Sequence, residues 1–298
     1  MISIVIPTYN EEKYLPKLLT SIENQTYKKY EIIVADNNST DKTRKLAKKF
    51  GCKIVEGGLP GVGRNNGARK AKGQYLLFLD ADVLIPRDFL ELAFNEFQNR
   101  YLEIATCSIV PLSDKAIDKL LYFGYNQYVG AVQYFNPKAP GFCILCTKRL
   151  FDRVRGFNES MKLGEDHDFC ERAGKIAKFR VLESTNVFIS VRRFKKEGRL
   201  NLVKKYALNY LYSFITDDIN VVDYNYGGYE DLPDKEKKLL LKKYIHMLKD
   251  QISVLEKEYA GLRIKLGKGK EKLKRELRQK QKSIQEKINT LSGKNSNN

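Results

Sequence analysis

Apolar runs and helix-like segments alternate through the first part of the chain. Four runs have the composition of strands, and none shows the strict alternation of a strand with one wet face. They are ISIVI at 2–6, EIIVA at 31–35, CKIVE at 52–56 and YLLFL at 75–79. Segments with helical periodicity follow them at about 11–24, 41–50, 62–72 and 88–99. This repeated strand–helix unit predicts an α/β fold, with a mostly parallel sheet covered by helices on both sides.

The pattern loosens from about residue 103 to residue 230. Four short strand-like runs alternate there with helical segments rich in aromatic residues: IATCSIV, FCILCT, FRVLE and VFISV. We expect this half to complete the sheet and to frame a second binding region. The stretch YNYGGYEDLPD, at 224–234, combines glycines, acids and a proline, which is typical of a boundary ahead of a new helix. The sequence therefore predicts one domain over 1–230.

A regular apolar repeat marks the last segment of the sequence, 234–298. Apolar residues from Leu241 to Leu266 follow alternating spacings of four and three, the heptad seam of a coiled coil. GKGK at 267–270 interrupts this repeat. The pattern predicts a helical hairpin or coiled-coil tail, and the tail is basic, with 19 Lys and Arg against 8 Asp and Glu. Two roles are open for it, self-association into a homo-oligomer and contact with an anionic membrane.

Charge and composition narrow the class of protein only in part. A formal net charge of +18 attracts nucleic acid, anionic lipid and small phosphorylated ligands alike. Five cysteines, an odd number, fit a reducing compartment better than a disulfide framework. The sequence starts without a secretory-signal pattern, and its longest uncharged run, 120–135, can lie on a membrane surface but is too polar to cross one. We expect a cytoplasmic protein, with peripheral contact at the inner face of the membrane as an open alternative.

Two carboxylates stand directly after the buried run YLLFL. On an extended chain Asp80 and Asp82 project the same way, and the carboxyl ends of parallel strands are where such sheets bind ligands. Two carboxylates held close need a cation, and hard oxygen ligands suit Mg²⁺ or Mn²⁺, which can bridge a diphosphate. We expect a metal and a nucleotide, rather than another side chain, to balance these charges. The alternative for such a pair is an exposed turn, against which its place after a buried strand argues.

The ends of the first two strands offer groups that suit a nucleoside. Pro7, Tyr9 and Glu11 follow the first strand, with an aromatic face and polar groups ahead of a helix N-terminus. Asp36 and Asn38 follow the second, where a carboxylate can accept hydrogen bonds from a base or a ribose. Alternatives stay open, because Tyr9 can be a packing residue and NNSTD an ordinary helix cap.

Four segments, in their order and spacing, resemble one known family. They are SIVIPTYNEEKYLPKLL, EIIVADNNSTDKT, GVGRNNGARKAKGQYLLFLDAD and GFNESMKLGEDHDFCERA. Together they are similar to the nucleotide-sugar-dependent glycosyltransferases of family 2, over roughly residues 1–190. The resemblance implies the GT-A fold, which is Rossmann-like, and therefore a GT-A domain followed by the helical tail.

The resemblance also implies roles for single residues. The residues expected around the nucleoside are Pro7, Tyr9, Glu11 and Asp36. Asp80 is expected at the ribose or nucleotide, Asp82 on the Mg²⁺ or Mn²⁺ of the diphosphate, and Arg64, in GRNNG, at the nucleotide.

The segment GEDHDFCER supplies the candidate base. Transfer of a sugar to a hydroxyl with inversion needs a base on the acceptor side. In the family this base is the aspartate of an E-D pair, which implies Asp166, with Glu165 beside it at the acceptor or sugar. Alone, the segment would be explained better as a helix N-terminus enriched in acids. We expect neither His167 nor His246 to bind the metal.

The family's common Q-x-x-R-W signature is absent, and the chain has ISVRRFKKEGR instead. Arg192 and Arg193, just past a strand, can neutralise the diphosphate in its place. A solvated basic turn is an equal alternative.

The expected function is transfer of a sugar, with inversion and with a divalent metal, from a nucleotide-sugar donor to a glycan or lipid-linked acceptor. A rival from another class is a non-catalytic nucleotide-sugar or nucleic-acid-binding protein that uses its basic tail. The presence of both a candidate metal ligand and a candidate base in one sequence argues against this rival. We therefore expect no nucleic-acid partner. An NAD-dependent oxidoreductase fits poorly, because the third glycine of its fingerprint falls on Asn66. Cys143 and Cys146, in CILC, are expected to be buried structural residues.

Overall fold

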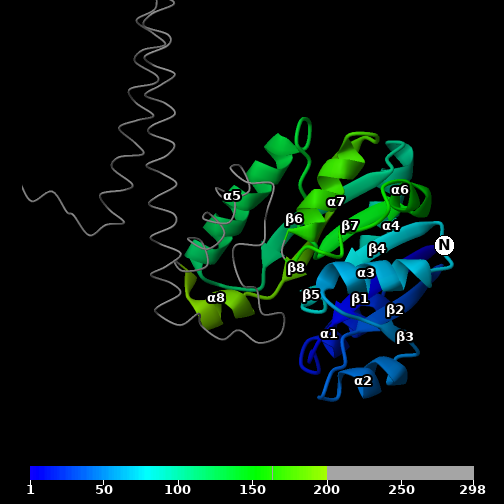
Figure 1. Ribbon diagram of the computed structural model, residues 1–298. Coiled ribbons are helices and arrows are strands. Elements are labelled where there is room, and N and C mark those ends of the chain that lie inside the picture. Colours follow the sequence, from blue (N-terminus) through cyan, green and yellow to red (C-terminus); the bar gives the residue numbers. More distant parts are fainter. Residues whose placement is uncertain (163, 200–298) are drawn as a thin grey trace, which may run out of the picture. The chain divides into compact units, whose positions relative to one another are not determined.

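A computed structural model describes residues 1–162 and 164–199 of the chain (Figure 1). The predicted tail at 234–298, with its coiled coil, and the predicted boundary near residue 230 lie outside the described residues. In the described part, one eight-stranded sheet has the order β3-β2-β1-β4-β7-β6-β8-β5. Its strands are β1 Ile2–Thr8, β2 Tyr30–Asp36, β3 Lys53–Glu56, β4 Tyr75–Leu79, β5 Val83–Leu84, β6 Ile104–Pro111, β7 Cys143–Thr147 and β8 Phe179–Ile189.

Helices connect these strands. They are α1 Leu15–Glu23, α2 Thr43–Lys49, α3 Pro60–Arg69, α4 Phe89–Asn99, α5 Ala116–Val132, α6 Lys148–Arg153, α7 Glu165–Gly174 and α8 Arg192–Glu197. The four strand–helix units predicted for the first part of the chain are confirmed. Their strands pair in parallel, β2 and β4 on either side of β1 and β3 beyond β2. The carboxyl ends of β1, β2 and β4 therefore meet at one edge of the sheet.

The second half of the sheet is mixed. β7 pairs antiparallel with β4 and also with β6, and β6 runs parallel to β8. The two runs FRVLE and VFISV, predicted as separate strands, belong to one strand, β8. The polar residues between them form a register shift opposite Cys107 and Ser108. The Glu96 carboxylate of α4 accepts hydrogen bonds from the amides of Glu183 and Ser184 there, so the shift leaves those donors satisfied.

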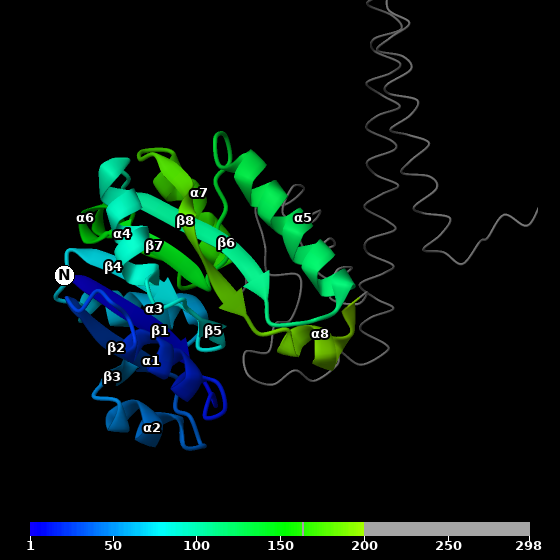
Figure 2. The same ribbon diagram turned by 180° about the vertical axis from the view of Figure 1, so that it is seen from behind.

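Helices cover both faces of the sheet, as predicted (Figures 1 and 2). One buried cluster joins the sheet to α1 and α4, through residues such as Leu18 and Phe97. The other joins it to α3, α6 and α7, where the rings of Phe157 and Phe169 stack at 4.4 Å. All five cysteines are free and buried, and Cys143 and Cys146 fall in opposite clusters, which confirms their structural character.

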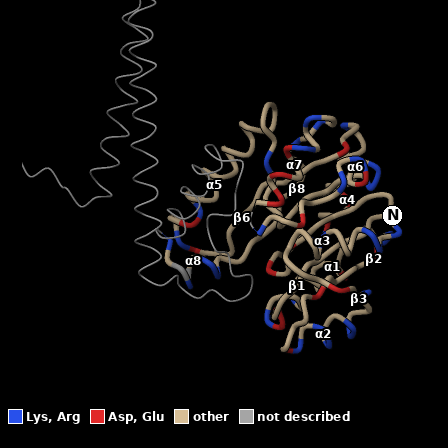
Figure 3. The backbone as a smooth tube through the Cα atoms, viewed as in Figure 1, with Lys and Arg blue, Asp and Glu red and all other residues tan. Residues whose placement is uncertain are grey.

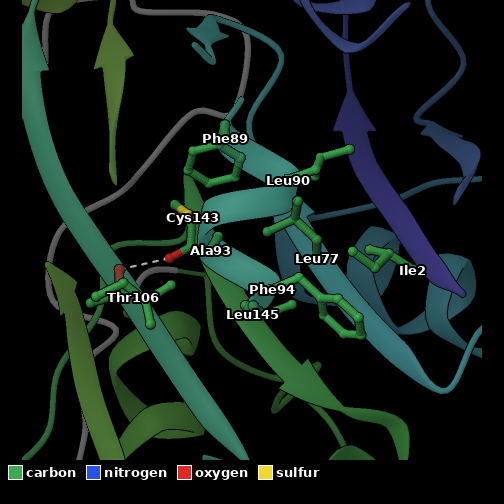
Figure 4. Close-up of a pocket in the computed structure, with 10 residues that line it drawn as sticks. Ile2, Leu77, Phe89, Leu90, Ala93, Phe94, Thr106, Cys143 and Leu145 are labelled. Carbon is green, nitrogen blue, oxygen red and sulfur yellow. Dashed lines mark hydrogen bonds between the residues drawn. The ribbon is translucent and has the colours of Figure 1, made fainter. Parts of the chain in front are cut away.

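A small apolar cavity lies inside the first cluster (Figure 4). Side chains of β4, β6, β7 and α4 line it, among them Leu77 and Phe89, and the Thr106 hydroxyl beside it donates to the carbonyl of Cys143 at 2.7 Å. Its volume of about 10 Å³ holds one water at most. The cavity is therefore a small packing defect of the core.

Helix α5 turns one apolar face to solvent. Ile117, Leu120 and Phe123 are exposed on it, as are Tyr134 and Phe135 just after its end. In Figure 3 most of the backbone of this helix is tan, the colour of residues other than Lys, Arg, Asp and Glu. Among the described residues, no helix combines the length and apolar character needed to span a bilayer.

Candidate active site

The ends of β1 and β2 come together as predicted. Thr8 and Asp36 are register partners, and the fully buried Asp36 carboxylate accepts from the hydroxyls of Thr8 at 3.1 Å and Ser39 at 2.6 Å. Arg44 lies 3.4 Å from the same carboxylate. The helix-cap alternative for NNSTD applies to a different acid, because the amide of Thr43, the first residue of α2, donates to Asp41. It does not apply to Asp36.

The other residues predicted at these strand ends have mixed exposure. Pro7 is buried within β1, Tyr9 is half-buried and Asn38 is exposed in the left-handed region, at φ 51°. Asn10 also has a positive φ, and its side chain accepts from the Thr40 amide at 2.9 Å. This bond fastens the loop after β1 to the loop after β2.

Asp80 and Asp82 do not lie on an extended strand. The Val83 amide donates to the Asp80 carbonyl, so β4 ends in a turn, and the extended conformation assumed for the two aspartates is wrong. Asp80 accepts from Arg64 at 2.8 Å, whereas Asp82 lies 2.9 Å from the Nε of Arg192. The expectation that no other side chain balances these charges is therefore also wrong, since each acid has an arginine.

Arg64 of α3 joins two parts of the site. Its Nη1 donates to Glu165 at 2.6 Å and its Nη2 to Asp80 at 2.8 Å, and the side chain is 3% exposed. The backbone of Gly141 packs on this guanidinium, because a Cβ at Gly141 would lie 2.8 Å from the guanidinium carbon. The backbone of Gly141 thus confines the Arg64 guanidinium, and any larger residue at position 141 must displace it.

Glu165 and Asp166 begin α7. Gly164, in the left-handed region at φ 79°, turns the chain into the helix. Asp166 Oδ2 accepts from the Gly141 amide at 2.6 Å, and Oδ1 accepts from the His167 amide at 2.8 Å. Because both acids have partners outside their helix, the pair is more than an acidic helix N-terminus.

Burial raises the pKa of Glu165 to about 7, with the Asp166 charge adding to the rise and Arg64 opposing it. An acid that titrates near neutrality beside Asp166 makes the charge of this end of the site depend on pH.

Arg192, at the start of α8, reaches back to the first strand–helix unit. Its two terminal nitrogens donate to both oxygens of Glu11 at 2.7 Å. Its guanidinium lies 4.5 Å from the ring centre of Tyr14. The side chain is 24% exposed, so for Arg192 the solvated-turn alternative is wrong.

Burial also raises the pKa of Asp82 and of Glu11. The charges of Arg192 and Arg193 act against the rise at Asp82, and Arg192 acts against it at Glu11. The negative charge of Asp80 adds to both rises. These acids therefore share one electrostatic field, and a cation placed among them stabilises all of them.

Two contributors were missed from the sequence. Gly141 acts through its amide and its missing side chain, and the signal available was the turn dipeptide Pro140–Gly141. Tyr14 packs its ring on Arg192, and nothing in its local sequence distinguishes it from a core residue.

The donor set offers a hard divalent ion part of a coordination shell, which water or a ligand must complete. Among residues 1–162 and 164–199, no group of three His, Cys, Asp or Glu side chains is arranged to hold a metal. Asp82, with Asp80 and Glu11 as neighbours, offers carboxylate oxygens of the kind Mg²⁺ and Mn²⁺ prefer. Diphosphate oxygens and water can complete such a shell, so the residues fit an ion shared with a nucleotide.

The fold matches solved glycosyltransferases. TarS of Staphylococcus aureus, residues 1–349 in complex with UDP-GlcNAc, superposes with a TM-score of 0.54 at 23% identity, over 63% of this chain and 58% of that one. A mannosyltransferase of Pyrobaculum calidifontis, in complex with GDP-Man and Mn²⁺, gives 0.53 at 22% identity, over 63% and 56%. The described part of the chain thus has the GT-A fold.

Sequence comparison points to the same class of protein. Residues 3–146, just under half of the chain, match the model of Glycosyl transferase family 2. Glycosyltransferase GlyA of Streptococcus pneumoniae is 27% identical over 67% of the chain and 27% of its own length. TarS, a poly(ribitol-phosphate) beta-N-acetylglucosaminyltransferase, is 28% identical over 57% of the chain and 32% of its own. The chain spans about a third or less of these two relatives.

Proposed function

We propose that this protein transfers a sugar from a nucleotide-diphosphate sugar to a hydroxyl acceptor with inversion. The observation that carries the proposal is the Arg64 bridge, which connects Asp80 at the end of β4 to Glu165 beside the candidate base. Donor side and acceptor side are thereby adjacent. Relatives in complexes with UDP-GlcNAc and with GDP-Man support a nucleotide sugar as the donor class.

The donor would bind along the carboxyl edge of the sheet. The residues assigned to the nucleoside are Pro7, Tyr9, Glu11, Asp36 and Asn38. Asp80 is assigned to the ribose or nucleotide and Asp82 to Mg²⁺ or Mn²⁺, which would supply Lewis-acid stabilisation of the departing diphosphate. Arg64, Arg192 and Arg193 add positive charge where the leaving group gains negative charge.

The acceptor hydroxyl would give its proton to Asp166. A bond forms between the acceptor oxygen and the anomeric carbon as the bond from that carbon to the diphosphate oxygen breaks, and attack from the opposite face inverts the centre. Two backbone amides fix the rotation of the Asp166 carboxylate. Glu165 is assigned to contact with the acceptor or sugar, beside the base.

A panel of UDP-, GDP- and other nucleotide sugars tests the proposal, with Mn²⁺ or Mg²⁺ and with EDTA. Thermal shift reports binding, and donor hydrolysis or transfer to an added acceptor reports chemistry. Asp82→Asn should abolish metal-dependent turnover, and the exposed Asp88→Asn should not. Turnover unaffected by EDTA contradicts the metal assignment. Donor binding without turnover in any combination supports the non-catalytic alternative.

We also propose that the exposed face of α5 contacts an anionic membrane, which would suit a lipid-linked acceptor. The face carries Leu120 and Phe123, 63% and 60% exposed, on a chain with net charge +18. The path from α5 leads through residues 133–140 to Gly141 and so to the acceptor side. Insertion of these apolar side chains favours a lipid surface, and the net positive charge of the chain, 11 of it in 234–298, favours an anionic one.

Sedimentation with phosphatidylglycerol vesicles tests this contact. Leu120→Ser with Phe123→Ser should weaken binding by at least about tenfold, since two apolar side chains lose their burial. Gln127→Ser, at an exposed polar position of the same helix, is the matched control. Equal binding of the three proteins contradicts the proposal. Self-association through 234–298 is a separate proposal, tested by mass in solution with and without that segment.

A further inference from the structure

Arg192 is positioned as an internal cation among carboxylates. Both oxygens of Glu11 accept from it at 2.7 Å, and Asp82 Oδ2 lies 2.9 Å from its Nε. The exposed fractions of these side chains are 24% for Arg192, 11% for Glu11 and 8% for Asp82. Three elements meet here, because Glu11 precedes α1, Asp82 precedes β5 and Arg192 begins α8.

The physical need for this cation is clear from the two acids. Each is buried, the charge of Asp82 raises the pKa of Glu11, the charge of Asp80 raises the pKa of both, and Arg192 lowers the pKa of both. Two buried carboxylates without a counter-ion would be partly protonated or would repel one another. Arg192 meets that need for both at once, with two hydrogen bonds in the plane of one fork.

Two cations, Arg192 and a divalent ion, compete for the Asp82 carboxylate. Asp82 is the residue that the proposed function assigns to a divalent ion, and its Oδ2 is the atom that Arg192 approaches. A guanidinium and a divalent ion in contact with one carboxylate repel each other strongly in a site shielded from water. Arg192 therefore opposes the binding of an ion to Asp82 as long as it stays beside that carboxylate, while Glu11 can keep its two bonds.

We propose that Arg192 is the resident counter-ion of Asp82 in the donor-free protein and competes with divalent metal for that carboxylate. This inference rests on the proposed function for the assignment of Asp82 to a metal. It makes Arg192 a positioning residue, whose guanidinium holds the Asp82 carboxylate in place until the ion displaces it. The affinity for metal is then set in part by a residue that is not itself a metal ligand.

Mn²⁺ alone is the probe, added without nucleotide and followed by the electron paramagnetic resonance signal of the free ion. Arg192→Gln should bind Mn²⁺ at least about tenfold more tightly than the wild type, because a competing charge is removed. Arg193→Gln, whose charge also acts on Asp82, is the matched control and should have a smaller effect. Adding Asp82→Asn to Arg192→Gln should remove the gain.

Unchanged or weaker Mn²⁺ binding by Arg192→Gln overturns the inference, and so does an equal gain in Arg193→Gln. Arg192→Lys retains the charge but not the forked geometry, so its gain in Mn²⁺ affinity should be intermediate. This variant replaces Arg192→Gln in the test if Arg192→Gln fails to fold. In the wild type, the Nε–H resonance of Arg192 should shift with added Mg²⁺, and a resonance that does not move contradicts displacement.

Failure of this inference and failure of the proposed function give different results. Tighter Mn²⁺ binding by Arg192→Gln, with no transfer from any nucleotide sugar, keeps the competition and removes the transferase. Metal-dependent transfer by the wild type, with Mn²⁺ affinity unaffected by Arg192→Gln, keeps the transferase and removes the competition.

Discussion

The Arg64 guanidinium donates to the Glu165 carboxylate at 2.6 Å, across 101 positions of sequence. Both side chains are almost fully buried, at 3% and 7% exposure. A buried ion pair of this kind fixes the relative position of its two side chains more than it stabilises the fold, because the cost of desolvation offsets much of its attraction. Its consequence is that α3, which packs on β1 and β2, and α7, whose first turn carries the candidate base, are fixed relative to each other.

Asp166→Asn should lower transfer by about 10² to 10⁴, the contribution of a general base, with little change in the fold. Asparagine keeps the shape of the side chain but cannot take the acceptor's proton. Initial rates at saturating donor measure the loss, and circular dichroism checks the fold. Glu171→Gln, a partly exposed acid of the same helix paired with Lys175, serves as control. Undiminished transfer by Asp166→Asn removes the proposed base.

Glu165→Gln should remove a pH dependence of stability. The pKa of Glu165 is about 7 in the folded protein, against an ordinary value of 4.5. A raised folded pKa means that the stability this group contributes is complete below pH 4.5 and is lost as pH rises to about 7. Above pH 7 the free energies of unfolding of the two proteins should change with pH in the same way. Urea unfolding from pH 4.5 to 8 measures both free energies, and an equal dependence on pH over the whole range would contradict the raised pKa.

Arg64→Lys should reduce kcat/KM by about tenfold to a hundredfold, because a lysine cannot hold two carboxylates in the fork geometry and a charged hydrogen bond contributes about 1.5–3 kcal/mol. Steady-state kinetics with the preferred donor measures the effect. Arg69→Lys, on the same helix and 59% exposed, is the control and should behave like the wild type.

Gly141→Ala should destabilise the protein by about 1–3 kcal/mol, as overpacking does, and should lower transfer as well. The added methyl group would overlap the Arg64 guanidinium, and the loop that moves away carries the amide bonded to Asp166. Chemical denaturation and initial rates measure the two effects. Gly124→Ala, in open space on α5, should instead stabilise by about 0.5–1 kcal/mol. Equal behaviour of the two alanine variants would count against the Gly141 contact.

The parts of the fold that could be predicted have local causes. Apolar runs broken by turn residues predicted β1 to β4 and the helices between them, because each unit buries its own apolar residues. The long β8 was predicted as two strands, since the polar residues in its middle are satisfied by Glu96, more than eighty positions away. A side chain so distant leaves no local pattern.

The same distinction applies to the site. Its residue types and strand-end positions could be predicted, and the structure brings Glu11, Asp82 and Arg192 together in one group and Arg64, Asp80 and Glu165 in another. The pairing within each group could not be predicted. Which arginine takes which acid depends on the turn after β4 and on the entry of α8, and both are set by tertiary packing.

The strand order also constrains how the domain assembles. β6 precedes β7 in the chain, yet β7 lies between it and β4. During synthesis, β1 to β4 can form their parallel sheet early, but the outer edge of β4 stays open until β7 arrives, and β6 has no place in that sheet before then. The step that closes this edge also delivers Gly141, two residues ahead of β7, to Arg64. Chains arrested before residue 147 should therefore expose the unpaired edge of β4, which is prone to aggregation, and lack the contacts that Glu165 and Asp166 make with Arg64 and Gly141.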